Sequence, residues 1–190
     1  MSILVTGGAR SGKSAFAEKL CKILAPEAIY IATAQAYDNE MRERIALHTM
    51  ERSQADYAWT TVEEPINLAE LLQEWGQTDH TNGAKAPTIM VDCLTLWLSN
   101  VLLSVEEQHE VTWKVKVEIQ RLVELVASYP GNLILVTNEV GDGIVPEYPL
   151  GRLYRDFAGL MNQAVARVCS QVFLVTAGIP IELKRLEYKL

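Results

Sequence analysis

A glycine-rich segment near the N-terminus constrains the fold of this chain more than any other feature. Residues 7–14 read Gly-Gly-Ala-Arg-Ser-Gly-Lys-Ser, which matches the phosphate-loop pattern G-x-x-x-x-G-K-[ST]. An apolar run at 3–5 precedes the segment and a helical pattern follows it. In this strand–loop–helix context, backbone N–H groups surround one anion, Lys13 reaches the β- and γ-phosphates and the Ser14 hydroxyl holds Mg²⁺. The segment therefore predicts binding of a nucleoside triphosphate rather than a glycine-rich turn with an incidental Lys-Ser pair.

The length and composition indicate one ordinary globular domain spanning residues 1–190. Hydrophobic residues make up 49% of the chain and charged residues 22%, as in soluble proteins with a substantial core. The net charge of −7 argues against a nucleic-acid-binding surface. Three scattered cysteines without a Cys-x-x-Cys pair are interpreted as buried thiols in a reducing compartment.

No targeting or membrane-spanning segment is recognised in the sequence. The N-terminus lacks a basic region followed by a long apolar stretch, and no apolar run approaches the length of a membrane span. We therefore expect a cytoplasmic protein that does not span a membrane.

Short apolar runs alternate with helical patterns along the chain. The runs at 3–5, 28–32, 57–62, 88–92, 133–137 and 171–175 predict strands, and 179–183 predicts an added edge strand. Helices are predicted after the phosphate loop, from Asp38 to about Arg52, from Pro65 to Trp75, over 94–103, from a capping box at Ser104 and Glu107 to Pro130, and over 150–168. The fold class is therefore α/β, with a mostly parallel sheet covered by helices on both faces. Ligands of such sheets bind beyond the carboxyl ends of the strands.

Asp92 ends the predicted strand at 88–92. Phosphate-loop proteins commonly place an acid at such a position, where it helps to hold Mg²⁺. Asp is also favoured as a helix N-cap for its own sake. Because the loop requires a metal partner, we prefer the metal role and keep the capping role as the alternative.

His48 is the histidine with the most informative neighbours. On one helix from Asp38, the side chains of Arg44, His48 and Arg52 fall four residues apart on one face. Two guanidinium groups favour a neutral imidazole and bind phosphate oxygens, and a neutral imidazole beside a bound phosphate is a competent nucleophile. Spacing alone, however, favours a solvated helix face with an incidental histidine. His80 and His109 are interpreted as surface residues.

Charged residues around 139–156 leave several interpretations open. Arg152 and Arg155 are suited either to binding phosphates or to pairing with acids across a subunit contact. Glu139 and Asp142 are suited either to assisting a metal or to shaping a glycine turn. The sequence does not separate these alternatives.

Taken together, these segments resemble one family over essentially the whole length, the bifunctional adenosylcobinamide kinase / adenosylcobinamide-phosphate guanylyltransferases of cobalamin biosynthesis. The most telling match is the run Val-Thr-Asn-Glu-Val-Gly-Asp-Gly-Ile-Val-Pro at 136–146. The other matching positions are 3–14, 30–34, 40–41, 44–45, His48, 91–95, Trp97, Asn100, Arg152, 155–156, 158–159 and 162–163. A phosphate loop alone is shared by many families, whereas this set in this order is similar to one.

The resemblance implies a two-step enzyme with a P-loop fold like the RecA core. It would phosphorylate the aminopropanol hydroxyl of adenosylcobinamide with ATP or GTP. It would then transfer GMP from GTP to that phosphate through a covalent GMP–histidine intermediate, for which the family's histidine aligns with His48. The implied metal ligands are Ser14 and Asp92. The implied nucleotide contacts are Gly7, Gly8, Ala9, Arg10, Ser11, Gly12, Lys13, Ser14, Ala32, Thr33, Ala34, Thr49, Met50, Glu51, Arg52, Glu63 and Asp92.

The resemblance also implies partners and leaves two alternative functions. Its substrates would be a corrinoid and nucleotides, and its members resemble trimers, so a homo-oligomer is expected. Some relatives carry Glu where this chain has Asp92, and either acid is suited to coordinating Mg²⁺ or to binding a ribose hydroxyl. No Asn-Lys-x-Asp guanine-reading motif is present, so the GTP preference comes from the resemblance alone. The alternatives are a P-loop small-molecule kinase that does not need His48, and a nucleotide-gated regulatory module.

Overall fold

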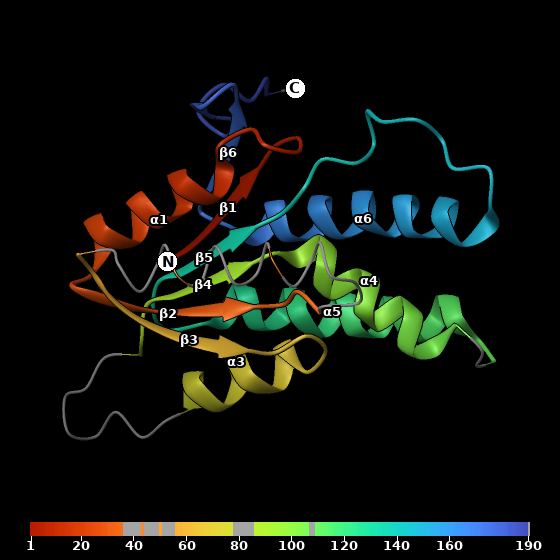
Figure 1. The fold of residues 1–190 in the computed structure, drawn as a ribbon, viewed down its shortest axis with the longest axis horizontal. Helices are drawn as coiled ribbons and strands as arrows, with labels where there is room; N and C mark the ends of the chain where they lie inside the picture. Colours follow the sequence, from red (N-terminus) through yellow and green to blue (C-terminus); the bar gives the residue numbers. More distant parts are fainter. Residues whose placement is uncertain (36–42, 44–49, 51–55, 78–85, 107–108, 190) are drawn as a thin grey trace.

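One seven-stranded sheet contains every strand of the part of the chain that the structure describes. The structure is a computed structural model that describes residues 1–35, 43, 50, 56–77, 86–106 and 109–189. The strand order is β3-β2-β4-β5-β1-β6-β7, and only the β6–β7 pair is antiparallel (Figure 1). The strands are β1 (Ser2–Thr6), β2 (Glu27–Ala32), β3 (Ala58–Glu63), β4 (Ile89–Asp92), β5 (Leu133–Val136), β6 (Gln171–Thr176) and β7 (Ile179–Glu182).

The central strands are mostly apolar because helices cover both of their faces. All five residues of β1 and all four of β5 are buried, which is typical of parallel strands between two helical layers. β7 forms one of the two exposed edges, where Pro180 is tolerated because an edge strand does not need every N–H group. The predicted mostly parallel sheet is confirmed, including its added edge strand.

The two faces of the sheet are covered unequally among the described elements. Helix α1 (Lys13–Leu24) packs on one face, where Ala17 and Cys21 join the side chains of Ile3 and Val5 in one buried cluster. Helices α3 (Leu68–Gln77), α4 (Leu94–Val105), α5 (Val111–Ser128) and α6 (Pro149–Val168) cover the other face, where Leu4 points. Figure 1 shows α1 apart from this second group of helices. None of the described helices combines the length and apolar character needed to cross a membrane.

Two predicted helix starts are wrong. The helix expected at Pro65 begins at Leu68, because the Glu64 carboxylate accepts hydrogen bonds from the Ile66 and Asn67 amides and shapes a turn there. Ser104 does not cap the next helix, because it lies inside α4 and its hydroxyl donates to the Val101 carbonyl. The helix expected over Asp38–Arg52 falls largely outside the described residues.

Candidate functional site

The predicted site residues converge at one edge of the sheet. In the strand register Ala32 pairs with both Glu63 and Asp92, and Asp92 pairs with Val136, which pairs with Val5. The carboxyl ends of the parallel strands therefore form one row, and the phosphate loop follows β1 at the same edge. Strand β5 lies between the loop's strand and the strand of Asp92. This edge is where open α/β sheets bind their ligands.

The phosphate loop ends directly at the first turn of α1. Arg10 and Gly12 adopt the left-handed conformation, with φ of 55° and 93°, and Gly12 is the N-cap residue of α1. The Phe16 amide donates to the Gly12 carbonyl at 3.0 Å, which closes the first turn. The Lys13 ammonium donates to the Gly8 carbonyl at 3.1 Å and so lies over its own loop. A helix N-terminus and an ammonium group thus meet at one place, which favours an anion.

The loop packs tightly against β6 and the turn that follows it. The Ser11 carbonyl accepts a hydrogen bond from the Gly178 amide at 2.8 Å. A Cβ on Gly7 would overlap the Val175 carbonyl oxygen and lie 2.7 Å from the Ser11 Oγ. Among the described residues, the buried hydroxyls of Thr6 and Ser11 have no hydrogen-bond partner. Both hydroxyls lie at the phosphate loop and are buried without a partner.

Asp92 is held through its side chain by Tyr30 of β2 and through its backbone by Thr33, which follows β2. The Tyr30 hydroxyl donates to the Asp92 Oδ2 at 3.0 Å, and the Thr33 amide donates to the Asp92 carbonyl at 3.2 Å. The N-cap residue of α4 is Cys93, which makes no side-chain cap bond. The alternative role of Asp92 as the helix cap is therefore wrong.

A buried network of hydroxyls and amides supports this corner of the sheet. The Asn100 side chain, 4% exposed, donates to the Thr33 carbonyl at 2.8 Å and the Pro65 carbonyl at 3.0 Å. After the neighbouring strand β5, the side-chain amide of Asn138 donates to the Thr95 hydroxyl at 2.9 Å. Asn162 accepts from the Thr137 hydroxyl at 2.7 Å and donates to the Asn138 carbonyl at 3.1 Å. The strand ends at this edge are thereby connected to α4 and α6.

Sequence patterns did not reveal these supporting roles, although one signal was present. Asn100 lies in an apolar helix, and Asn162 lies beside an apolar helical stripe. A carboxamide in such a place usually serves a buried hydrogen bond. Tyr30 offered no such signal, because a tyrosine is ordinary in a strand.

The arginines at the start of α6 bind the loop that precedes this helix. Arg152 donates to the carbonyls of Pro146, at 3.1 Å, and Glu147, at 2.6 Å, and Arg155 donates to the Gly141 carbonyl. The Glu139 carboxylate accepts from the Gly141 amide at 3.0 Å. Of the alternatives for Glu139, the glycine turn is therefore observed. The Glu139 amide also donates to the Gly7 carbonyl at 3.1 Å, which connects this segment to the phosphate loop.

The remaining predicted contacts differ in accessibility. Ala32 and Ala34 are half-buried, Glu63 and Met50 are exposed, and Thr33 is fully buried. His48, Thr49, Glu51 and Arg52 lie outside the described residues, as does His80. His109 is exposed, as expected.

The donor set at this edge fits a hard divalent cation held mainly by the nucleotide. Ser14 offers a hydroxyl and Asp92 a carboxylate, both oxygen ligands of the kind that Mg²⁺ prefers. No cluster of three or more His, Cys, Asp or Glu side chains suited to a metal occurs in the described ranges. Mg²⁺ typically takes one or two protein ligands, with phosphate oxygens and water completing its shell.

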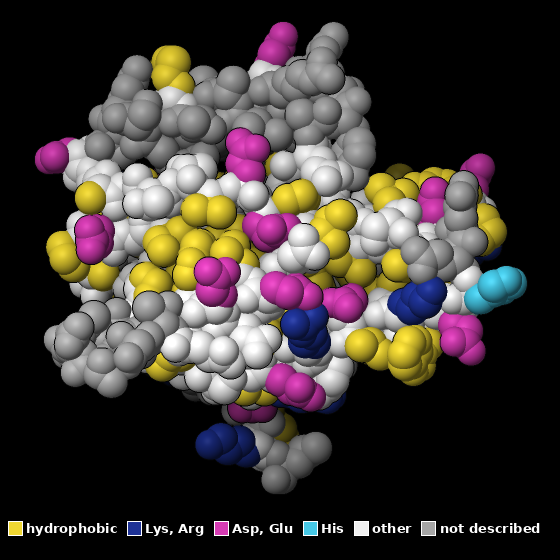
Figure 2. All heavy atoms as spheres, turned by 90° about the horizontal axis from the view of Figure 1, so that it is seen from below, with side chains coloured by type: hydrophobic (Ala, Val, Ile, Leu, Met, Phe, Trp, Pro, Cys, Tyr) yellow, Lys and Arg dark blue, Asp and Glu magenta, His cyan; other side chains and the backbone are white. Residues whose placement is uncertain are grey.

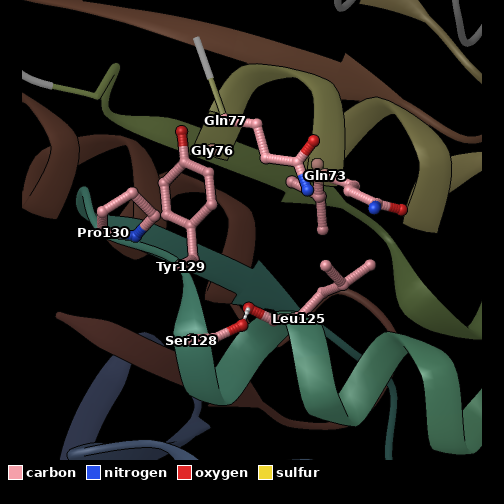
Figure 3. A pocket seen from close by; sticks show the side chains of 8 residues that line it. Gln73, Gly76, Gln77, Leu125, Ser128, Tyr129 and Pro130 are labelled. Atoms are coloured by element: carbon pink, nitrogen blue, oxygen red, sulfur yellow. Dashed lines mark hydrogen bonds between the residues drawn. The ribbon is translucent and has the colours of Figure 1, made fainter. Parts of the chain in front are cut away.

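A cavity of about 120 Å³ lies elsewhere, between α3 and α5 (Figure 3). Gln73 and Gln77 line it from α3, and Tyr129 lines it where α5 ends. The Tyr129 hydroxyl donates to the Pro87 carbonyl at 2.9 Å. Because Tyr129 precedes β5, the cavity lies at the edge opposite the phosphate loop, and it brings together none of the predicted site residues.

The surface and the cysteines agree with the composition. On the face shown in Figure 2, acidic side chains are scattered among hydrophobic ones, and the described residues form no continuous basic surface there.

Cys21, Cys93 and Cys169 are all buried and free, as predicted. Burial raises the pKa of Cys21 and of Cys169 from 9.0 to about 12.

The strand, glycine-rich loop and helix, together with an acid two strands away in a parallel sheet, define a P-loop nucleotide-binding α/β protein. Solved structures share this fold. A prototypical ATPase of a type III secretion system superposes with a TM-score of 0.50 at 14% identity, over 92% of this chain and 51% of its own. The assembled ATPase EscN from enteropathogenic E. coli gives 0.53 at 14% identity, over 93% and 43%.

The sequence comparisons narrow this class to one family. Residues 3–183 match the family described as "Cobinamide kinase / cobinamide phosphate guanyltransferase", and the chain belongs to that family. It is 42% identical to the bifunctional adenosylcobalamin biosynthesis protein CobP of Pseudomonas aeruginosa, over 97% of this chain and 98% of that protein. It is 38% identical to the bifunctional protein CobU of Escherichia coli, over 97% and 100%.

Proposed function

We propose that this protein phosphorylates adenosylcobinamide with ATP or GTP and then transfers GMP from GTP to the new phosphate. The observation that carries the proposal is the phosphate loop at the head of α1, aligned with Asp92 at one sheet edge, in a chain that belongs to this family from residue 3 to 183. The product of the second step is adenosyl-GDP-cobinamide.

In the first step the aminopropanol hydroxyl of the corrinoid attacks the γ-phosphorus. The bond from that phosphorus to the β–γ bridging oxygen breaks, and the nucleoside diphosphate leaves. The loop amides and the Lys13 ammonium stabilise the negative charge on the phosphates, which is the main catalytic requirement of phosphoryl transfer. A Mg²⁺ ion held by Ser14 and Asp92 would supply further neutralisation of this charge.

In the second step the His48 imidazole attacks the α-phosphorus of GTP. Pyrophosphate leaves, and a P–N bond to GMP forms. An oxygen of the corrinoid phosphate then attacks the same phosphorus, and the P–N bond breaks. The phosphate loop would bind the β- and γ-phosphates that depart. The assignment of His48 rests on the sequence resemblance and on the flanking Arg44 and Arg52.

The same proposal includes the residues that contact the nucleotide and the organisation of the protein. The nucleotide contacts are the loop 7–14, the segment 32–34, residues 49–52, Glu63 and Asp92. We further propose that residues 1–190 form one domain that works in the cytoplasm as a homo-oligomer, a trimer by resemblance.

Product analysis tests the proposal and separates its alternatives. Adenosylcobinamide is incubated with ATP or with GTP, and the corrinoid products are identified by mass spectrometry. We expect the phosphate ester with ATP and the GDP derivative with GTP. Lys13→Ala is expected to remove both products and His48→Ala only the second. A phosphate ester without any GDP derivative would indicate the single-activity kinase, and nucleotide binding without either product would indicate the regulatory module.

A further inference from the structure

We propose that Tyr30 is a positioning residue that orients the Asp92 carboxylate toward the metal ion of the nucleotide site. The inference rests on the proposed function, in which Asp92 helps to hold Mg²⁺. Tyr30 lies outside the set of loop, acid and histidine, and it acts through Asp92 rather than through contact with substrate.

The strand register explains how Tyr30 reaches Asp92. Tyr30 pairs with Met90 on the neighbouring strand, and Asp92 lies two residues beyond Met90. Side chains two residues apart project from the same face of a strand, so Tyr30, Met90 and Asp92 share the face that α1 covers. The tyrosine ring spans the offset, and its hydroxyl donates to the Asp92 Oδ2 at 3.0 Å.

Packing fixes the position of the Tyr30 ring. The residue is only 6% exposed and belongs to the buried cluster under α1. Its ring meets the Trp59 ring edge-on, with centroids 5.9 Å apart, and Trp59 meets Tyr57 in the same manner at 4.9 Å. A hydroxyl on a ring held in this way has a defined direction, so it restricts the rotation of the carboxylate that accepts from it.

The backbone around Asp92 is fixed by Thr33, the residue that follows β2. Its carbonyl accepts from the Thr33 amide at 3.2 Å, and the Thr33 hydroxyl bonds both backbone polar groups of Cys93. With its Oδ2 held by Tyr30 and its backbone carbonyl held by Thr33, Asp92 is oriented before any metal arrives. Hydrogen bonds of this kind to a metal-binding carboxylate typically change metal affinity by about 10–100-fold when removed. A tyrosine that only filled space would affect stability without affecting metal dependence.

The experiment compares two hydroxyl deletions in the same aromatic cluster. Tyr30→Phe removes the bond to Asp92. Tyr57→Phe removes bonds from the Tyr57 hydroxyl to the Ala25 carbonyl, at 3.0 Å, and the Cys21 carbonyl, at 3.3 Å, which lie away from the site. GTP binding is measured by calorimetry across a series of Mg²⁺ concentrations and again in EDTA, with circular dichroism to verify the fold of each variant.

We expect Tyr30→Phe to raise the Mg²⁺ concentration for half-maximal enhancement of GTP binding about tenfold, without changing the affinity in EDTA. Tyr57→Phe should leave both quantities unchanged. In an Asp92→Asn background, Tyr30→Phe should have no further effect on the Mg²⁺ dependence, because its partner carboxylate is gone.

Three results would overturn the inference in different ways. A wild-type Mg²⁺ dependence in Tyr30→Phe would reject the positioning role and leave the proposed function intact. Wild-type protein that binds GTP without any Mg²⁺ dependence would reject the metal role of Asp92 and the inference with it. Wild-type protein that does not bind GTP would reject the proposed nucleotide site as well.

Discussion

The Thr33 hydroxyl engages both backbone polar groups of Cys93. It donates to the Cys93 carbonyl at 2.8 Å and accepts from the Cys93 amide at 2.9 Å. This pair of bonds connects Thr33, which follows β2, to Cys93, which lies between β4 and α4 directly after Asp92. Thr33 is 0% exposed, so its hydroxyl serves the scaffold of the site, whatever its backbone contributes to a nucleotide.

Replacing Thr33 with Val should therefore destabilise the protein. Valine keeps the shape but leaves the buried Cys93 amide without this partner, which costs about 1–3 kcal/mol. Thr33→Ser retains the hydroxyl and is the matched control, with a smaller loss. Urea unfolding measures both, and equal losses for Val and Ser would show that the hydroxyl contributes nothing.

Gly7 and Gly8 should respond differently to substitution by alanine. At Gly7 an added Cβ meets the Val175 carbonyl and the Ser11 side chain, whereas at Gly8 nothing lies within 4 Å. We expect Gly7→Ala to lose about 1–3 kcal/mol of stability through overpacking, with Gly8→Ala close to wild type. Thermal unfolding compares them, and equal midpoints would contradict the close packing of the loop on β6.

Stability should decline at alkaline pH because of buried thiols. In the unfolded chain a thiol ionises near pH 9.0, whereas burial holds the pKa of Cys21 and Cys169 near 12. Between these values the unfolded state releases protons that the folded state retains. The free energy of unfolding should then fall by about 1.4 kcal/mol per pH unit for each such thiol.

The control for this decline is Cys21→Ala, which should be less stable overall but show a shallower decline. Urea unfolding between pH 8 and pH 10.5 under reducing conditions measures the slope. A stability that stays constant or rises across this range would contradict the burial of the thiols.

The segment between β5 and α6 should loosen when Arg155 is replaced. Its guanidinium donates to the Gly141 carbonyl. Removing one hydrogen bond to a charged donor that is half exposed costs about 1 kcal/mol, or roughly fivefold in local opening. Hydrogen exchange over residues 139–148 should be faster by about that factor in Arg155→Met. Arg167→Met, at the far end of α6, is the control, and exchange in this segment that matched wild type in Arg155→Met would contradict the assignment.

The architecture could be predicted from the sequence because strands, helices and the phosphate loop leave local or periodic patterns in it. Apolar runs indicated the strands, and the glycine spacing indicated the phosphate loop. The rule that ligands bind at the carboxyl ends of strands selected the edge where Asp92 lies. The family's sequence pattern supplied the named contacts.

The features that the sequence did not predict involve partners distant in sequence, or side chains that compete locally for backbone hydrogen bonds. The pairing of Tyr30 with Asp92 depends on the strand register, which a single strand pattern does not contain. Arg152 and Arg155 bind backbone carbonyls, which are present at every residue and leave no pattern in the sequence. The late start of α3 follows from the Glu64 carboxylate competing for amides that helical propensity alone would place in a helix.

The central claim is that His48 carries GMP between GTP and the corrinoid phosphate, and its most direct test is covalent labelling. The protein is incubated with Mg²⁺ and GTP labelled at the α-phosphate, then denatured and separated from free nucleotide. The account predicts one acid-labile label per active site, lost in His48→Ala and retained in His109→Ala, which changes an exposed histidine. A wild-type protein that takes up no label, or a label that survives His48→Ala, would contradict it.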